Sequence, residues 1–418
     1  MNIHDRTATP VTVNGRQYRW PKAPTVVVCI DGSEPGYIER AIEQGLAPNF
    51  ERLMQSGEHL LAHSVIPSFT NPNNISIITG RPPAVHGIAG NYFLDPTTGE
   101  EVMMNDARFL RADTIMKGFH DAGARVAVVT AKDKLRTLLG HGLDMGSGRA
   151  IAFSSETADK ATLAGNGIDN LLDFVGMPLP AVYSAELSEF VLAAGVKILK
   201  AHRPDLMYLS TTDYVQHKAA PGSEVANAFY AMLDRHVGEL DACGCVLALT
   251  ADHGMNDKHR PDGEPDVLYL EEVLDTWLGA GAARVILPIT DPYVVHHGAL
   301  GSFATIYLPK DAGAEGIIAK LQGLEGVALA LTRDEACRRF ELPSDRIGDV
   351  VAISTIHKVL GTRRAKHDLS GLTEPLRSHG GVTEQVVPMI LNRKVELPNG
   401  RSLRNFDVFD VALNRVAA

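Results

Sequence analysis

The chain has 418 residues, of which 45% are hydrophobic and 22% charged, a composition typical of a globular protein with one large and one smaller domain. Its formal net charge of −10, without a long basic run, argues against nucleic acid as the main partner. Four cysteines are too few for a disulfide scaffold of this size, and no apolar run is long enough to cross a bilayer. The polar residues 1–24 contain no segment resembling a signal peptide, so we expect a soluble, cytoplasmic protein. Within these residues, Asn14-Gly15 predicts a short hairpin.

Short apolar runs alternate with longer segments of helical spacing along the chain. Five such runs predict buried strands of a mostly parallel sheet, at residues 25–30, 125–130, 206–210, 246–250 and 386–391. Segments with helical spacing lie at residues 38–57, 114–122, 186–201 and 225–240. Residues 140–180 show no clear period and are expected to be an irregular connection. The pattern predicts an α/β fold in which helices flank the sheet.

The pattern changes between residues 264 and 368. Short segments here suggest a small mixed α+β unit, at residues 267–279, 284–287, 301–308, 314–321 and 327–331. The chain then returns to the main sheet. We therefore expect a core of residues 1–263 and 369–418, with residues 264–368 as an inserted cap domain.

The stretch from Ser68 to Ile88 predicts a turn that delivers the hydroxyl of Thr70 to the start of a short helix. Pro72 suits a first helical turn and Gly80 suits a helix end. A helix N-terminus presents unpaired N–H groups and positive partial charge, which favour an alkoxide or a phosphate-like anion. The alternative is that Thr70 only caps the helix.

Acidic and histidine residues follow several of the predicted strands. The carboxyl ends of parallel strands line the ligand crevice of an open α/β sheet, so these side chains are candidates to meet there. They are Asp31, Asp213, His217, Asp252 and His253. Any one of them alone is more simply a helix cap or a hydrogen-bonded loop residue, but together they form a nitrogen and oxygen donor set suited to Zn²⁺.

Seven short motifs occur along the chain in the order in which one known family carries them. They are Asp31-Gly32, Thr70-Asn-Pro-Asn73, Thr79-Gly80, His86-Gly87, Thr212-Asp213 with His217, Thr250-Ala-Asp-His-Gly254 and Ser378-His-Gly380. With these motifs the sequence resembles the alkaline phosphatase superfamily, in its nucleotide pyrophosphatase/phosphodiesterase branch. Within that branch, residues from about 25 to the C-terminus are similar to the phosphonoacetate hydrolase family.

The resemblance implies an alkaline-phosphatase-like core and two zinc ions per chain. One ion would be held by Asp31, Thr70, Asp252 and His253, and the other by Asp213, His217 and His379. Asn91 and the backbone N–H of Asn71 would hold a phosphoryl oxygen. His296 and His297 lie within the insertion, where surface or packing roles are favoured over an approach to the site.

The implied activity is hydrolysis of the C–P bond of phosphonoacetate to acetate and phosphate, with Thr70 as nucleophile and a covalent phosphothreonine intermediate. Lys132 and Lys134 follow the strand 125–130 and would bind the substrate carboxylate, unless both are solvated surface lysines. The alternative on the same di-zinc scaffold is a phosphodiesterase, nucleotide pyrophosphatase or phosphatase.

Other classes fit the sequence less well. A sulfatase is disfavoured because that branch uses a modified Cys or Ser, and a serine-dependent phosphoglycerate mutase is disfavoured because Thr stands at the nucleophile position. An inactive relative that only binds zinc or a phosphonate is disfavoured because every metal-contacting position is filled. The partners expected are a small-molecule substrate and, in a homodimer, a second copy, with no nucleic acid or membrane; a monomer is equally compatible.

Overall fold

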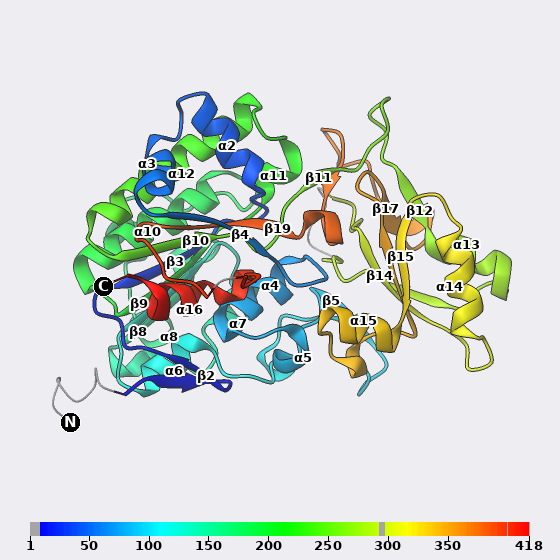
Figure 1. The fold of residues 1–418 in the computed structure, drawn as a ribbon, viewed down its shortest axis with the longest axis horizontal. Helices are drawn as coiled ribbons and strands as arrows, with labels where there is room; N and C mark the ends of the chain where they lie inside the picture. Colours follow the sequence, from blue (N-terminus) through cyan, green and yellow to red (C-terminus); the bar gives the residue numbers. More distant parts are fainter. Residues whose placement is uncertain (1–8, 292–296, 399, 418) are drawn as a thin grey trace.

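The computed structural model describes residues 9–291, 297–398 and 400–417. Its largest sheet has helices on both faces (Figure 1). The strand order is β4 (Glu58–His63), β19 (Val386–Leu391), β10 (Val246–Thr250), β3 (Thr25–Cys29), β9 (Leu206–Ser210), β7 (Val126–Thr130) and β8 (Ala150–Ser154). The strands from β10 to β8 are parallel, whereas β19 is antiparallel to β10 and to β4. The predicted α/β fold with a mostly parallel sheet is confirmed.

Strand β3 shows why helices are needed on both faces of the sheet. Val26 and Val28 pack in one apolar cluster, with helices α2 (Pro35–Glu43), α3 (Pro48–Ser56), α10 (Glu186–His202) and α12 (Glu224–Ala242). Val27 and Cys29 pack in the other, with α4 (Thr70–Thr79), α6 (Ile115–Asp121), α7 (Asp133–Leu139) and α16 (Val408–Asp410). Successive side chains of a strand point to opposite faces, so an unbroken apolar run is what a doubly covered strand requires.

Two expectations about local structure were wrong. The segment 38–57 is not one helix, because Gly45 adopts a left-handed conformation (φ 72°) after α2 and Pro48 then begins α3. Residues 140–180 are not wholly irregular, because they contain β8. Two of the five residues in β8 are alanines, which have low strand propensity, so the sequence signal is weak. The hairpin at Asn14-Gly15 is present between β1 (Val11–Val13) and β2 (Arg16–Tyr18).

A second, antiparallel sheet lies beyond one side of the large sheet (Figure 1). Its order is β13 (Arg284–Ile286), β14 (Phe303–Tyr307), β16 (Val350–Ser354) and β15 (Val327–Thr332). The neighbouring elements are α13 (Leu270–Leu278), α14 (Ala314–Gln322), α15 (Arg333–Phe340) and the parallel pair β12 (Val267–Tyr269) and β17 (Val359–Gly361). All of them lie within the predicted insertion, whose boundaries at residues 264 and 368 stay a prediction.

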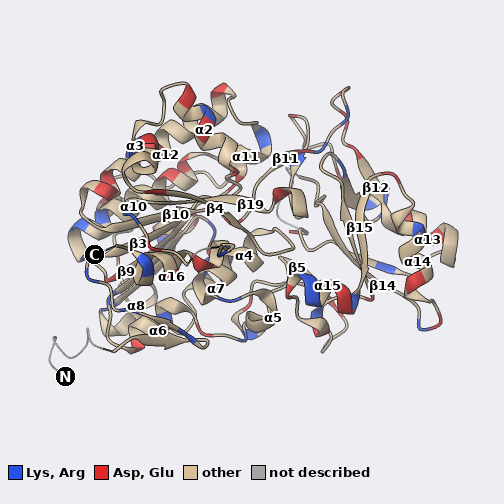
Figure 2. Cartoon of the chain, viewed as in Figure 1, with Lys and Arg blue, Asp and Glu red and all other residues tan. Residues whose placement is uncertain are grey.

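Charged residues of both signs occur on the helices of the large sheet and on those of the second sheet (Figure 2). The ion pair of Lys258 and Glu384 is fully buried: Lys258 Nζ lies 2.9 Å from Glu384 Oε1 and donates a hydrogen bond to the carbonyl of Ile356 at 2.6 Å. Lys258, which follows β11 (Asn256–Asp257), thus joins the turn before β19 to the turn between β16 and β17. None of the helices in the described ranges is both long enough and apolar enough to span a membrane.

Candidate metal and substrate site

Thr70 is the first residue of helix α4. The capping position is Phe69, whose backbone is extended (φ −117°, ψ 162°), and no side chain caps the helix. Thr70 therefore does not cap the helix; its half-buried side chain lines a cavity. The helix ends at Gly80 in a left-handed conformation (φ 66°), as the sequence predicts. The unpaired N–H groups of the first turn place positive partial charge beside the Thr70 hydroxyl.

Carboxylates and imidazoles follow the carboxyl ends of three adjacent strands. Asp31 follows β3, Asp213 follows β9, and Asp252 and His253 follow β10. Strand β3 lies between β10 and β9, so these ends meet at one edge of the sheet. Two further histidines join them, from α11 (Tyr214–Lys218) and from the residue after β18 (Arg377–Ser378): His217 and His379.

The three histidines His217, His253 and His379 share one hydrogen-bonding pattern. The Nδ1 atom of each lies 2.8 to 2.9 Å from a backbone carbonyl oxygen. A carbonyl only accepts, so Nδ1 carries the proton and Nε2 keeps its lone pair. Nε2 of His217 lies 2.9 Å from Asp213 Oδ2, that of His379 lies 3.6 Å from the same oxygen, and that of His253 lies 3.2 Å from Asp31 Oδ1. The lone pairs therefore face carboxylate oxygens.

This arrangement fits a divalent cation. The structure contains two groups of three residues whose potential ligand atoms lie within 4.8 Å of one another in each group. One group is Asp213, His217 and His379, and the other is Asp31, Asp213 and His253, so Asp213 belongs to both. Asp31 Oδ1 and His253 Nε2 are buried and have no hydrogen-bond partner among the described residues. Lone pairs facing one another in a buried site are unfavourable unless a cation lies between them. Nitrogen and oxygen donors are the ligands expected for Zn²⁺ when thiolates are absent.

Burial and neighbouring charges shift the pKa values of the cluster. Burial raises the pKa of Asp31 well above its usual range, and the nearby carboxylates of Asp213 and Asp252 raise it further. Burial also acts to raise the pKa of Asp213, but His217, His379 and His253 together outweigh it and hold that pKa well below the usual range. Burial lowers the pKa of His379 well below its usual range. The site thus favours a neutral His379 beside crowded carboxylates, a combination that positive charge would stabilise.

Asp252 lies behind this cluster and is held by hydrogen bonds. Its Oδ1 accepts from two backbone N–H groups at 3.0 and 3.1 Å, and its Oδ2 accepts from Asn74 Nδ2 at 3.1 Å. The Asn74 carbonyl in turn accepts from Tyr208 OH at 2.7 Å and from Ser210 Oγ at 2.8 Å. These bonds fix the orientation of the carboxylate.

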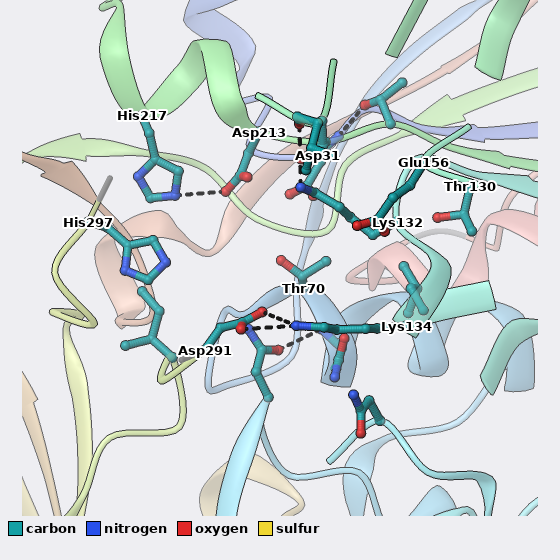
Figure 3. Close-up of a pocket in the computed structure, with 18 of the residues that line it drawn as sticks. Asp31, Thr70, Thr130, Lys132, Lys134, Glu156, Asp213, His217, Asp291 and His297 are labelled. Atoms are coloured by element: carbon teal, nitrogen blue, oxygen red, sulfur yellow. Dashed lines mark hydrogen bonds and ion pairs between the residues drawn. The ribbon is translucent and has the colours of Figure 1, made fainter. Parts of the chain in front are cut away.

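A cavity of about 260 Å³ extends from the cluster to Lys132 and Lys134. Figure 3 shows Thr70 between His217 and His297 on one side and the two lysines on the other. Lys132 precedes helix α7 and Lys134 lies in its first turn. The sequence leaves open whether Lys132 and Lys134 bind the substrate carboxylate or are surface residues; in the structure both line the same cavity as Thr70.

The two lysines have different neighbours. Lys132 Nζ lies 4.9 Å from the centre of the Tyr183 ring and 3.5 Å from the carbonyl of Val182, and burial lowers its pKa. Lys134 Nζ lies 3.1 Å from Oδ1 and 3.2 Å from Oδ2 of Asp291. Asp291 belongs to the connection between β13 and β14 of the second sheet, so a residue of the predicted insertion contributes to the cavity wall.

The predicted phosphoryl-binding pair also comes together. The Asn71 backbone N–H donates to Asn91 Oδ1 at 3.0 Å, and both residues line the cavity. The backbone N–H of Asn91 donates to the carbonyl of Pro288 at 2.8 Å, which links this loop to the second sheet.

All the predicted site residues gather at this cavity, either in its wall or directly behind it. Those in the wall are Asp31, Thr70, Asn71, Asn91, Lys132, Lys134, Asp213, His217 and His379. Asp252 and His253 lie behind Asp31, with His253 stacked on His379 at 3.6 Å between ring centres.

The sequence did not assign to the site four titratable residues of the cavity wall: Glu156, Tyr183, Asp291 and His297. His297 was expected in a surface or packing role, yet its ring lies 5.2 Å from that of His217; His296 is outside the described residues. Glu156 lies two residues after the end of strand β8, so prediction of that strand would have made Glu156 a candidate site residue. The others carry no local signal, because only tertiary structure brings their segments to the site.

Comparison with known proteins assigns the fold. Residues 25–381 match the model of the family described as type I phosphodiesterase/nucleotide pyrophosphatase. The crystal structure of phosphonoacetate hydrolase from Sinorhizobium meliloti 1021 in complex with phosphonoformate is similar, with 63% identity, a TM-score of 0.95, and coverage of 98% of this chain and 99% of that chain. The complex of phosphonoacetate hydrolase from the same organism with phosphonoacetate has 62% identity, the same TM-score and the same coverage. The alkaline-phosphatase-like fold expected from the sequence is thereby confirmed.

More distant curated relatives agree at the family level. An uncharacterized pyrophosphatase/phosphodiesterase of Schizosaccharomyces pombe is 23% identical over 289 residues, which are 64% of this chain and 51% of that protein. The chain spans about half or less of the length of the curated relatives it matches. The match to these relatives therefore covers one part of longer proteins.

Proposed function

The chain belongs to the type I phosphodiesterase/nucleotide pyrophosphatase family, and from that premise we propose that it hydrolyses the C–P bond of phosphonoacetate to acetate and inorganic phosphate. The observation that carries the proposal is the pair Lys132 and Lys134 across a small cavity from Thr70. The similarity to phosphonoacetate hydrolase over nearly the whole chain supports it.

Thr70 is the proposed nucleophile. Its Oγ1 forms a bond to phosphorus while the C–P bond breaks on the opposite side, and the hydroxyl proton that Oγ1 gives up balances the proton that the departing carbon takes up. The product of this step is phosphothreonine, which water then hydrolyses to release phosphate and regenerate Thr70. The N–H of Asn71 and the side chain of Asn91 would hold a phosphoryl oxygen, so that the phosphorus atom stays in line with Oγ1.

The leaving group explains the need for two lysines. A departing carbon keeps the electron pair of the C–P bond, which is tolerable only if that pair delocalises into the adjacent carboxylate before the carbon takes up a proton. The carboxylate oxygens then gain negative charge. Compact ammonium groups at Lys132 and Lys134 are suited to stabilise it, because they bind these oxygens more strongly as the charge grows.

We further propose two zinc ions as cofactors. Asp31, Thr70, Asp252 and His253 would hold one, and Asp213, His217 and His379 the other. When bound, the ions would supply positive charge at the phosphoryl group and lower the pKa of hydroxyl groups at the site.

Residues 264–368 are proposed to act as a cap on the core. The support is the approach of the β13–β14 connection to the cavity, through Pro288 and Asp291. Such a cap would restrict the cavity to small substrates.

The test compares three substrates with zinc-loaded protein. Phosphate release from phosphonoacetate is measured beside nitrophenol release from a nitrophenyl phosphate monoester and from a diester. A strong preference for phosphonoacetate is expected. A strong preference for either ester would instead assign the chain to the phosphodiesterase, nucleotide pyrophosphatase or phosphatase alternative that the family also contains.

A further inference from the structure

The ion pair between Lys134 and Asp291 joins the core to the second sheet inside the cavity (Figure 3). Both carboxylate oxygens of Asp291 lie within hydrogen-bond distance of Lys134 Nζ, at 3.1 and 3.2 Å. The Lys134 side chain is 36% exposed and that of Asp291 is 19% exposed. A lysine proposed to bind a substrate carboxylate thus already contacts a carboxylate of the protein.

The backbone before Asp291 is held close to the site. The carbonyl of Pro288 accepts a hydrogen bond from Asn91 N at 2.8 Å, and a Cβ placed on Gly90 would lie only 2.5 Å from Pro288 Cβ. This close packing keeps the start of the connection, and with it Asp291, beside the loop that carries Asn91. Asp291 is therefore built into the cavity wall by the position of its backbone.

A substrate carboxylate on Lys134 would lie within a few ångströms of Asp291. Two carboxylates that share one ammonium repel each other, and the repulsion is weakly screened because both lie in a cavity. The opposing effect of Asp291 is to restrict the rotamers of Lys134. Restricting one side chain can contribute at most the rotamer entropy of that side chain, whereas two carboxylates a few ångströms apart in a cavity repel each other by more, so the repulsion is the larger effect.

We propose that Asp291 is a specificity-determining residue that competes with ligand carboxylates for Lys134. The inference rests on the proposed function, which supplies a carboxylate-bearing substrate and acetate as product. Competition from Asp291 weakens the binding of both and so favours release of acetate after the C–P bond has broken. Lys132 differs, because no described carboxylate forms an ion pair with its ammonium, which contacts the Tyr183 ring and a carbonyl oxygen. The carboxylates of Glu156, Asp213 and Asp291 act on Lys132 only from beyond ion-pair distance, so they compete less directly for a ligand carboxylate.

The experiment replaces Asp291 by Asn in the full zinc-loaded chain. We expect Asp291→Asn to lower the KM for phosphonoacetate and the inhibition constant of acetate by about tenfold each, equivalent to about 1.4 kcal/mol. The KM for nitrophenyl phosphate should change by less than about twofold. The matched control is Asp266→Asn, which breaks an ion pair with Lys358 (2.8 Å) elsewhere in the predicted insertion and should change none of these constants.

A double-mutant cycle shows whether the effect passes through Lys134. In a Lys134→Ala background, Asp291→Asn should leave the KM for phosphonoacetate unchanged. If the single variant Asp291→Asn raises the KM for phosphonoacetate alone, Asp291 instead positions Lys134. If it changes the KM of both substrates equally, the effect is non-specific. Either result overturns the proposal. Calorimetric titration of phosphonoacetate into Thr70→Ala and Thr70→Ala/Asp291→Asn proteins gives the same comparison without turnover. Absence of phosphonoacetate cleavage by the unmodified chain would reject the proposed function, whereas unchanged binding in this titration would reject only the role of Asp291.

Discussion

The two ends of the cavity are built in different ways. The carboxylate and imidazole end comes from loops that follow strands of one sheet, and its side chains are almost inaccessible to solvent: Asp252 and His253 are 0% exposed and His379 is 2% exposed. The lysine end comes from the first turn of α7 and from a connection of the second sheet, and the Lys134 side chain is 36% exposed. One end is fixed by buried hydrogen bonds, and the other by an ion pair that a ligand can reach.

This difference separates two chemical tasks. Hydrogen bonds to backbone carbonyls fix the orientation of three imidazoles at the buried end, as a metal site requires. In the proposed function the accessible end faces the part of the substrate that leaves. On that proposal, a change at the lysine end alone would alter the leaving group that the site accepts and keep the chemistry at phosphorus.

Thr70→Ala has the largest expected effect, because it removes the proposed nucleophile and leaves both ends intact. We expect kcat to fall at least about a thousandfold for phosphonoacetate and for nitrophenyl phosphate alike. Zinc content and phosphonoacetate binding should persist, because Asp31, Asp252 and His253 remain to hold the ion that Thr70 would contact; metal analysis and calorimetry measure the two quantities. Retained turnover on either substrate would show that another group attacks phosphorus.

Asp213→Asn should disable the buried end. Asp213 is a proposed ligand of one ion and also lies beside Asp31 and His253, which would hold the other, so one substitution removes negative charge next to both proposed metal positions. We expect zinc affinity to fall at least about a hundredfold, measured by competition with a chelator. Asp266→Asn serves as the control, and zinc affinity equal to that of the control would contradict the shared role of Asp213.

Lys132→Ala and Lys134→Ala should affect only the accessible end. We expect each to lower kcat/KM for phosphonoacetate by about 10- to 100-fold, because the developing charge on the leaving group loses an ammonium. The value for nitrophenyl phosphate, whose leaving group carries no carboxylate, should change by less than about threefold. Equal losses on both substrates would mean that the lysines serve the phosphoryl group or the fold instead.

The same contrast explains what the sequence could predict. Asp31, Asp213 and Asp252 follow unbroken apolar runs, and a run of that kind identifies both the strand and the edge where its last residues meet others. Lys132 could be proposed for the same reason, since it follows β7. Asp291 could not, because its contact with Lys134 spans 157 residues and depends on how the second sheet packs against the core. Strand β8 was missed because its alanines give little strand signal, and Glu156 was missed with it.

The smallest expected effect tests how redundantly the buried end is held. Tyr208 OH donates to Asn74 Oδ1 at 2.7 Å, and Ser210 Oγ donates to the same oxygen at 2.8 Å. In Tyr208→Phe the Asn74 oxygen keeps its bond from Ser210, so Asn74 can still donate to Asp252. We expect the free energy of unfolding to fall by about 1 kcal/mol, as for loss of one buried hydrogen bond, with kcat/KM within about threefold of the unmodified chain.

Denaturant unfolding and zinc affinity provide the measurements, with Tyr269→Phe, in the predicted insertion, as the matched control. Zinc affinity more than about tenfold weaker in Tyr208→Phe would show that the second donor cannot hold Asn74 alone. The buried end would then depend on each of its hydrogen bonds. Unchanged zinc affinity in Tyr208→Phe would show instead that the hydrogen bonds to Asn74 are redundant, so that the buried end withstands the loss of one of them.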